Sequence, residues 1–221
     1  MKLSKRLQAI ALLVPPGSVV GDIGTDHGQL PCFLVQQGIC PRAVACDVNA
    51  QPLAGARRLI AEMQLAEQVE TRLGDGLSVL QPGEVETVTI SGMGGALMTE
   101  LLTNSPAVVS ALSALVLQPN LAANLLRQWA VEQGWHIAAE ELVYEDGRYY
   151  EVLGLKPGPG AALSEAELWL GPRLLAERHP LLPAYVQAEW AAEERVLEAL
   201  QQSQTPEALF KRDRLMQKRC V

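Results

Sequence analysis

Short apolar runs, each ending in a segment rich in glycine or aspartate, recur along the N-terminal part of the chain. Strands are expected at five of them, over residues 19–23, 42–47, 68–73, 85–91 and 114–118. The stretches between them carry apolar residues at the spacing that is typical of helices. Regular alternation of strand and helix predicts a mostly parallel sheet covered by helices on both faces. This pattern restricts the chain to an α/β fold.

The last two apolar runs differ from the first five. They cover residues 136–144 and 149–155 and flank the turn-forming residues Glu145, Asp146 and Gly147, so they predict an antiparallel hairpin. Five strand–helix units followed by a terminal hairpin is the strand order of class I, Rossmann-like methyltransferases. A plain dinucleotide-binding sheet would more often continue with strand–helix units. We therefore predict an α/β fold with a methyltransferase sheet.

A segment rich in proline and glycine separates this sheet from the C-terminal part of the chain. Beyond it, Ser164 and Glu167 form a capping-box sequence, and residues 181–202 have the periodicity of a long helix. Thr205 and Pro206 predict the start of a last helix. We expect a methyltransferase domain over residues 1–156, a linker over 157–163 and a small helical, coiled-coil-like domain over 164–221.

The charge of the chain is acidic overall and basic at both ends. The formal net charge is −7, yet the first six residues include three basic and no acidic side chains. The last fifteen residues include five basic side chains against two acidic ones. Basic ends on an acidic body could contact nucleic-acid phosphates, or they could be solvated helix faces. Charge alone favours the second interpretation.

The cysteine and hydropathy patterns argue against a metal-binding, a membrane and a secreted protein. No two of the four cysteines form a Cys-x-x-Cys pair, and no histidine cluster accompanies them, which predicts buried thiols and no metal. No apolar run approaches the about 20 residues of a membrane-spanning helix. The N-terminal segment resembles a signal peptide only weakly, because its apolar part ends at Pro15 and Pro16. We expect a cytoplasmic protein that starts with an amphipathic helix.

The loop after the first predicted strand has a chemically informative composition. A nicotinamide-binding loop would need Gly-x-Gly-x-x-Gly, but Asp26 and Gln29 stand where the second and third glycines would be. The pattern Asp-x-Gly-x-Gly-x-Gly of methyltransferases fits Asp22, Gly24 and Gly28, and Asp26 replaces its middle glycine. A carboxylate there would face the cationic sulfonium and amino group of a methyl donor. Alone, this loop is weak evidence.

Similar sites follow the next three predicted strands. Asp47 could accept hydrogen bonds from both ribose hydroxyls of an adenosine, or it could cap the next helix. Asp75 could receive an adenine amino group, or belong to a simple turn. The small residues 91–95 could leave room for a flat base beside the methyl group, or form a tight turn. Because the carboxyl ends of parallel strands share one edge of a sheet, these sites together predict one binding site.

Six segments carry a resemblance to a known family. They are DIGTDHGQLP, ACDVNAQPLAGAR, RLGDGL, ISGMGGALM, LVLQPN and VYEDGRYYEV. In order and spacing they resemble the bacterial tRNA (adenine-22-N1)-methyltransferases, from Leu3 to about Lys156. DIGTDHGQLP and GMGG are the distinctive segments, because most methyltransferases lack both. The family usually has an aromatic residue where Gln29 stands.

The resemblance implies an activity, a cofactor, a partner and two sets of site residues. The activity is transfer of a methyl group from S-adenosylmethionine to N1 of adenine 22 in tRNA, and we expect a monomer or a weak homodimer. The implied cofactor contacts are Asp22, Gly24, Asp26, His27, Asp47, Val48, Asp75, Gly76 and Met93. The implied base pocket is formed by Met93, Gly94 and Gly95, with Gln118, Pro119 and Asn120 beside it.

Asp26 is the candidate catalytic residue. Methylation at N1 places a positive charge on the ring, which a carboxylate could stabilise, or it could accept the proton later lost from the amino group. The alternative is that Asp26 only binds the cofactor. His27 could orient Asp26, contact the phosphate chain or make a structural hydrogen bond.

Other functions of the chain stay open at this point. We expect the basic tail Lys211–Arg219 to contact tRNA phosphates, or alternatively to pack or dimerise. Two other functional classes are a methyltransferase acting on a small molecule or protein and a non-catalytic cofactor-binding module.

Overall fold

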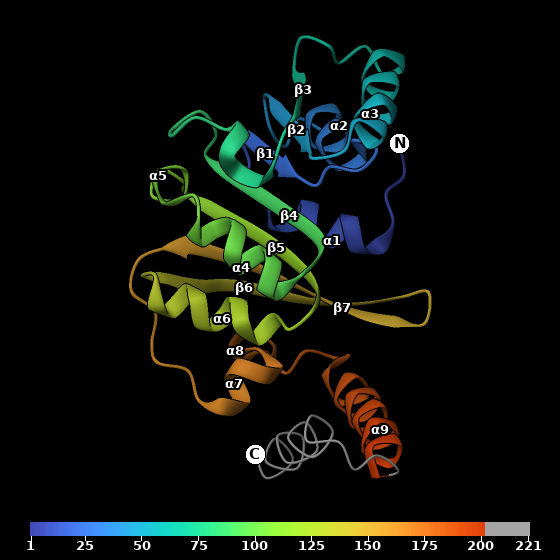
Figure 1. Ribbon diagram of the computed structural model, residues 1–221, viewed down its shortest axis with the longest axis vertical. Helices are drawn as coiled ribbons and strands as arrows, with labels where there is room; N and C mark the ends of the chain where they lie inside the picture. Colours follow the sequence, from blue (N-terminus) through green and yellow to red (C-terminus); the bar gives the residue numbers. More distant parts are fainter. Residues whose placement is uncertain (202–221) are drawn as a thin grey trace.

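A seven-stranded sheet forms the centre of the protein in the computed structural model, which describes residues 1–201 (Figure 1). Its order is β3-β2-β1-β4-β5-β7-β6. The first five strands are parallel, and β7 is antiparallel to both β5 and β6. This order confirms the predicted α/β fold with five parallel strands and a terminal hairpin. The strands are β1 (Val20–Ile23), β2 (Ala43–Asp47), β3 (Val69–Leu73), β4 (Thr87–Gly94), β5 (Ala114–Leu121), β6 (Trp135–Glu145) and β7 (Arg148–Pro157).

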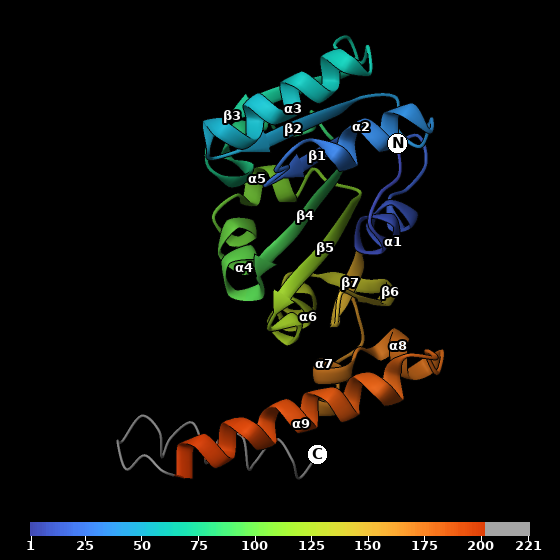
Figure 2. The same ribbon diagram turned by 90° about the vertical axis from the view of Figure 1, so that its right-hand side faces the viewer.

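Helices cover both faces of the sheet. One face packs against α4 and α6, and the other against α1, α2 and α3, each through its own apolar cluster (Figure 2). The strands β1 and β2 are buried at every position, as their nearly continuous apolar sequences require in a doubly covered parallel sheet. The helices and short turns of this part are α1 (Lys5–Leu13), α2 (Gln29–Gln36), α3 (Ala50–Glu62), η1 (Gly76–Val79), α4 (Gly95–Thr103), α5 (Pro106–Val109) and α6 (Ala123–Glu132).

The end of the fourth strand differs from its prediction. The expected strand over 85–91 continues to Gly94, and α4 begins directly at Gly95. Pairing of β4 with β5 shifts register between Ser91 and Met93 and again before Gly94, and Gly92 has a φ of +77°. The glycines that resembled a loop therefore form an irregular strand end, since glycine permits the backbone bend that such an irregularity needs. The short elements η1 and α5 were also not predicted.

Three further helices follow the proline- and glycine-rich segment: α7 (Glu165–Leu170), α8 (Pro172–Ala176) and α9 (Leu182–Gln201). The capping box that begins α7 is confirmed, with the Ser164 hydroxyl and the Glu167 carboxylate each bonded to the other's backbone. Leu142 of β6 packs with Leu174, Leu182 and Tyr185 of these helices. The separate helix α8 was not predicted. The last helix expected from Thr205 and the basic tail Lys211–Arg219 lie outside the described residues.

The described cysteines agree with the prediction of buried thiols. Cys32, Cys40 and Cys46 are buried free thiols, and burial raises the pKa of Cys46 to about 12. Cys220 lies outside the described part. Within residues 1–201 no helix is long and apolar enough to span a membrane, and no cluster of metal-ligating side chains is found.

Candidate functional site

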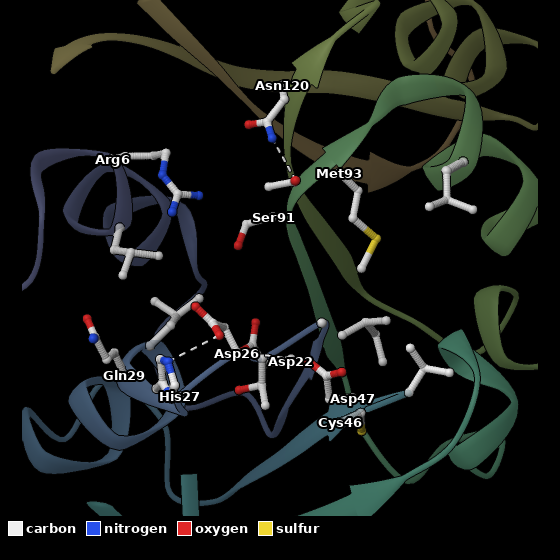
Figure 3. Close-up of a pocket in the computed structure, with 18 of the residues that line it drawn as sticks. Arg6, Asp22, Asp26, His27, Gln29, Cys46, Asp47, Ser91, Met93 and Asn120 are labelled. Atoms are coloured by element: carbon white, nitrogen blue, oxygen red, sulfur yellow. Dashed lines mark hydrogen bonds and ion pairs between the residues drawn. The ribbon is translucent and has the colours of Figure 1, made fainter. Parts of the chain in front are cut away.

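A cavity of about 910 Å³ lies at the carboxyl ends of β1, β2 and β4 (Figure 3). This is the place where open α/β sheets bind ligands. Side chains from α1, α4 and the β6–β7 hairpin complete its walls. Every residue implied as a cofactor contact lines this cavity: Asp22, Gly24, Asp26, His27, Asp47, Val48, Asp75, Gly76 and Met93. The fold thus brings together side chains that lie up to about 70 residues apart in the sequence.

Asp22 is the buried acid of the cavity. It is the last residue but one of β1, with 3% of its surface exposed, and its carboxylate accepts a hydrogen bond of 2.6 Å from the Thr89 hydroxyl. Burial raises the pKa of Asp22 above its ordinary value, although the hydrogen bond from Thr89 opposes this shift, and the charge of Asp47 adds to it. A positively charged group in the cavity would stabilise the ionised form of Asp22.

Asp26 stands in the loop that turns from β1 into α2. Its φ is +54°, a left-handed conformation that aspartate tolerates better than most residues, and Gly24 before it has a φ of +72°. The Asp26 side chain is 76% exposed and lies 3.5 Å from Nε2 of His27. Figure 3 shows both side chains on the opposite side of the cavity from Arg6 and Asn120. Asp26 is therefore accessible to a ligand in the cavity.

Asp47 is fixed by the backbone around it. Its Oδ1 accepts a hydrogen bond of 2.8 Å from the amide of Asn49, the residue that precedes α3, and its Oδ2 accepts a longer one of 3.4 Å from the amide of Asp26. Asp47 therefore closes a turn just before α3 and does not cap it, because the N-cap residue of α3 is Asn49 and has no side-chain cap hydrogen bond. The same carboxylate lines the cavity and keeps lone pairs for hydroxyl donors, because each oxygen can accept two hydrogen bonds.

The loop after β1 packs closely against Met93 at the edge of the cavity. A Cβ added to Gly24 would lie 2.4 Å from Cε of Met93, so glycine keeps the loop and the Met93 side chain in contact. Apolar side chains, among them Val48 and Leu101, line the same space as the four aspartates. These apolar side chains and hydrogen-bond-accepting carboxylates suit a ligand that combines a flat apolar ring, hydroxyl groups and a positive charge. S-adenosylmethionine has all three features.

The residues expected to form the base pocket divide into two groups. Met93 and Asn120 line the cavity, whereas Gly94, Gly95, Gln118 and Pro119 do not. The Asn120 amide donates a hydrogen bond of 2.6 Å to the carbonyl of Gly92 and so joins the ends of β4 and β5. Gln118 is fully buried. The implied lining of a base pocket by Met93, Gly94 and Gly95, with the other three residues beside it, stays a prediction, of which Met93 and Asn120 reach this cavity.

The chain also matches known proteins in sequence and structure. A family model described as "Methyltransferase domain" matches residues 3–153. A tRNA (adenine(22)-N(1))-methyltransferase of Bacillus subtilis (strain 168) is 37% identical over 185 residues, which cover 81% of this chain and 77% of that protein. The chain belongs to the tRNA (adenine-22-N1)-methyltransferase family.

Solved structures extend the similarity to the whole fold. The crystal structure of the M1A22 tRNA methyltransferase of B. subtilis superposes on this methyltransferase with a TM-score of 0.87 at 32% identity, covering 98% of this chain and 95% of that chain. The Streptococcus pneumoniae protein Sp1610, in complex with S-adenosyl-L-methionine, gives a TM-score of 0.84 at 31% identity, covering 98% of this chain and 99% of that chain.

Several side chains of this methyltransferase line the cavity without having been predicted as site residues, among them Arg6 and Tyr150. Arg6 belongs to the first turn of α1, and Tyr150 belongs to β7. Tyr150 lies in VYEDGRYYEV, one of the segments that carry the family resemblance, and this segment could have indicated that Tyr150 belongs to the site. Arg6 was counted only as part of a basic N-terminus, since nothing in its local sequence relates it to residues more than 100 positions away.

Proposed function

We propose that this methyltransferase transfers the methyl group of S-adenosylmethionine to N1 of adenine 22 in tRNA. The observation that carries the proposal is the meeting of Asp22, Asp26, Asp47 and Asp75, from successive loops at the strand ends, in one cavity that stays open beside Met93 and Asn120. The names of the relatives supply the substrate. The cavity supplies matching chemistry, because its acids suit a cationic methyl donor and its open side admits a base.

We also propose a division of labour along the chain. Residues 1–156 form the methyltransferase domain, residues 157–163 the linker, and residues 164–221 a helical domain that grips tRNA away from the chemistry. The protein acts in the cytoplasm, where its proposed substrate is modified, as a monomer or a weak homodimer.

The main task of the side chains is to position the two reactants. S-adenosylmethionine supplies a methyl group that its sulfonium already activates. Asp47 and Asp75 would hold hydroxyl and amino groups of the adenosine part and Asp22 would hold the cationic part, while Asp26 would act on the ring that receives the methyl group. Since N1 lies on the pairing edge of adenine, a paired adenine must leave its helix before it reaches Met93. Holding N1 in line with the methyl group then provides much of the rate enhancement.

The experiment that tests this proposal compares two tRNA transcripts that differ only at position 22, one with adenine and one with guanine. Methyl incorporation from labelled S-adenosylmethionine is expected with adenine 22 and not with guanine 22. Incorporation into both transcripts would place the methyl group elsewhere. No incorporation into either, with cofactor binding intact, would point to a small-molecule or protein acceptor or to a non-catalytic binding module.

The role of Asp26 gives a second expected result. Asp26→Asn keeps the size of the side chain and a residue type that tolerates the positive φ, but removes the charge. If the carboxylate stabilises the cationic ring or accepts its proton, kcat falls about 100-fold or more while cofactor affinity stays within a few-fold of the original value. Single-turnover methylation and calorimetric titration with S-adenosylmethionine measure the two quantities.

Asp146→Asn is the matched control for this prediction. Asp146 also has a positive φ, +49°, but it lies at the tip of the β6–β7 hairpin and does not line the cavity. Its replacement is expected to leave both quantities unchanged. A full kcat together with weakened cofactor binding in Asp26→Asn would assign Asp26 to cofactor binding alone.

A further inference from the structure

The cavity is lined by side chains of both charges, four aspartates and two arginines. Asp22 and Asp47 lie at the ends of β1 and β2, and Asp26 and Asp75 lie in the loops after β1 and β3. The arginines of the cavity are Arg6 of α1 and Arg148 of β7. Figure 3 shows Arg6 near Ser91 and Asn120, across the cavity from Asp26 and His27. The acidic side suits the positive charge of the methyl donor. The side that carries Arg6 therefore suits a negatively charged part of the second reactant, the RNA.

We propose that Arg6 binds a backbone phosphate next to the target nucleotide and so holds the extruded base over the methyl group. This assignment rests on the proposed RNA substrate and adds to it a specific contact within the cavity. It differs from general attraction by the basic ends of the chain, because it requires the guanidinium to contact one particular phosphate.

Three distant segments hold Arg6 in place. Its guanidinium donates a hydrogen bond of 2.6 Å to Oε1 of Gln118 and lies over the ring of Tyr150, 5.7 Å from the ring centre. The carboxylate of Glu145 accepts hydrogen bonds from the backbone amides of Lys5 and Arg6, at 2.6 and 3.2 Å, which fixes the first turn of α1. Such a fixed guanidinium loses little conformational entropy when it binds an anion.

The partner of Arg6 leaves its charge available. Gln118 is a neutral, fully buried amide whose own nitrogen donates to the carbonyl of Pro119, so it orients the guanidinium without neutralising it. Among residues 1–201 no carboxylate lies within ion-pair distance of the Arg6 guanidinium. Arginine has five N–H donors, so several remain for a phosphate.

The charge of the product excludes direct contact between Arg6 and the ring. Methylation makes the adenine ring positive, and a guanidinium bonded to it would raise the energy of the transition state. A nucleotide carries its negative charge on the phosphate. A Cβ added to Gly92 would lie 3.8 Å from the Arg6 guanidinium, so Arg6 is adjacent to the end of β4, where the base is expected to enter. A phosphate bound there would belong to the target nucleotide or its neighbour.

The first test compares Arg6→Gln with Lys5→Gln. Both variants remove one positive charge from the first turn of α1, but the Lys5 side chain is exposed and does not line the cavity. Arg6→Gln is expected to lower kcat/KM for tRNA at least 10-fold with unchanged affinity for S-adenosylmethionine. Arg6→Lys should recover part of the loss, and Lys5→Gln should stay within about twofold. Equal effects of Arg6→Gln and Lys5→Gln would overturn the proposal.

The second test uses the unaltered protein and needs no variant to fold. Transcripts carry a neutral methylphosphonate in place of the phosphate on the 5′ or the 3′ side of adenine 22. One of the two is expected to lower kcat/KM as much as Arg6→Gln does, and combining it with Arg6→Gln should cause little further loss. Full activity with both transcripts, or losses that simply add, would overturn the role of Arg6. Absence of methylation of the unmodified transcript would instead overturn the proposed function itself.

Discussion

Replacing Arg127 by methionine is expected to lower the free energy of unfolding by about 3–5 kcal/mol. Arg127 of α6 has 0% of its side chain exposed, and its guanidinium pairs with Glu140 of β6, at 2.7 Å, and with Glu151 of β7. Methionine keeps most of the volume, so the cost arises from the charges. Burial opposes the charge of Arg127, but the carboxylates of Glu151 and Glu140 outweigh burial and raise its pKa. Without the guanidinium, two carboxylates lose the cation that stabilises them.

The same cluster attaches the C-terminal helices to the sheet. Arg127 also donates hydrogen bonds to the carbonyls of Leu168 and Trp169, at 3.0 and 3.3 Å, near the end of α7. The hydroxyl of Tyr185, in α9, donates to Glu151 at 3.0 Å. The substitution is therefore expected to loosen α7 and α9 as well as the sheet edge.

Urea unfolding followed by circular dichroism measures the effect of the Arg127 substitution, and Arg173→Met is its control. The Arg173 side chain is 44% exposed and, within residues 1–201, forms an ion pair only with Glu177, one helical turn away, so its loss should cost less than about 1 kcal/mol. If the two variants differ by less than 1 kcal/mol, the buried cluster does not stabilise the fold. Adding Glu140→Gln and Glu151→Gln to the Arg127 variant should recover part of the loss, because no uncompensated carboxylate then remains.

This cluster marks the limit of what the sequence could predict. Arg127, Glu140 and Glu151 belong to one helix and two strands, and each stands in a segment whose other polar residues are exposed or half-buried. Their burial depends on how α7 packs against α6, a contact that no local pattern encodes. Arg6 was missed for the same reason, since its partner Gln118 lies 112 residues away.

The aspartates could be located because they follow apolar strands directly. Asp47 and Asp75 stand at or just beyond the ends of β2 and β3, and parallel strands place their carboxyl ends at one edge. The glycines after β4 were harder to place, because composition does not distinguish a loop from an irregular strand end. The resemblance implied that Gly94 and Gly95 line the base pocket, whereas in the structure Gly94 pairs with Leu121 of β5 and neither glycine lines the cavity.

Alanine substitutions at Gly94 and Gly95 are expected to change the stability of the protein by different amounts. A Cβ at Gly95 would lie 2.2 Å from the carbonyl oxygen of Ala122 and 2.9 Å from its carbonyl carbon, so the backbone between β5 and α6 would have to move. A Cβ at Gly94 would lie 3.9 Å from its nearest neighbours, both side-chain atoms of Leu121. Gly95→Ala is therefore expected to lower the free energy of unfolding by about 1–3 kcal/mol, and Gly94→Ala by less than about 0.5 kcal/mol.

The displaced backbone also carries part of the site. Ala122 has a φ of +59° and stands two residues after Asn120, whose amide holds the end of β4 through Gly92. Movement at Ala122 is thus expected to shift Asn120, and kcat/KM for tRNA should fall further in Gly95→Ala than its lost stability explains. Urea unfolding and methyl incorporation at 25 °C, where both variants are expected to stay folded, measure the two effects. Equal stability of the two variants would show that the wall behind the cavity yields to a methyl group, and that its close packing does not position the base.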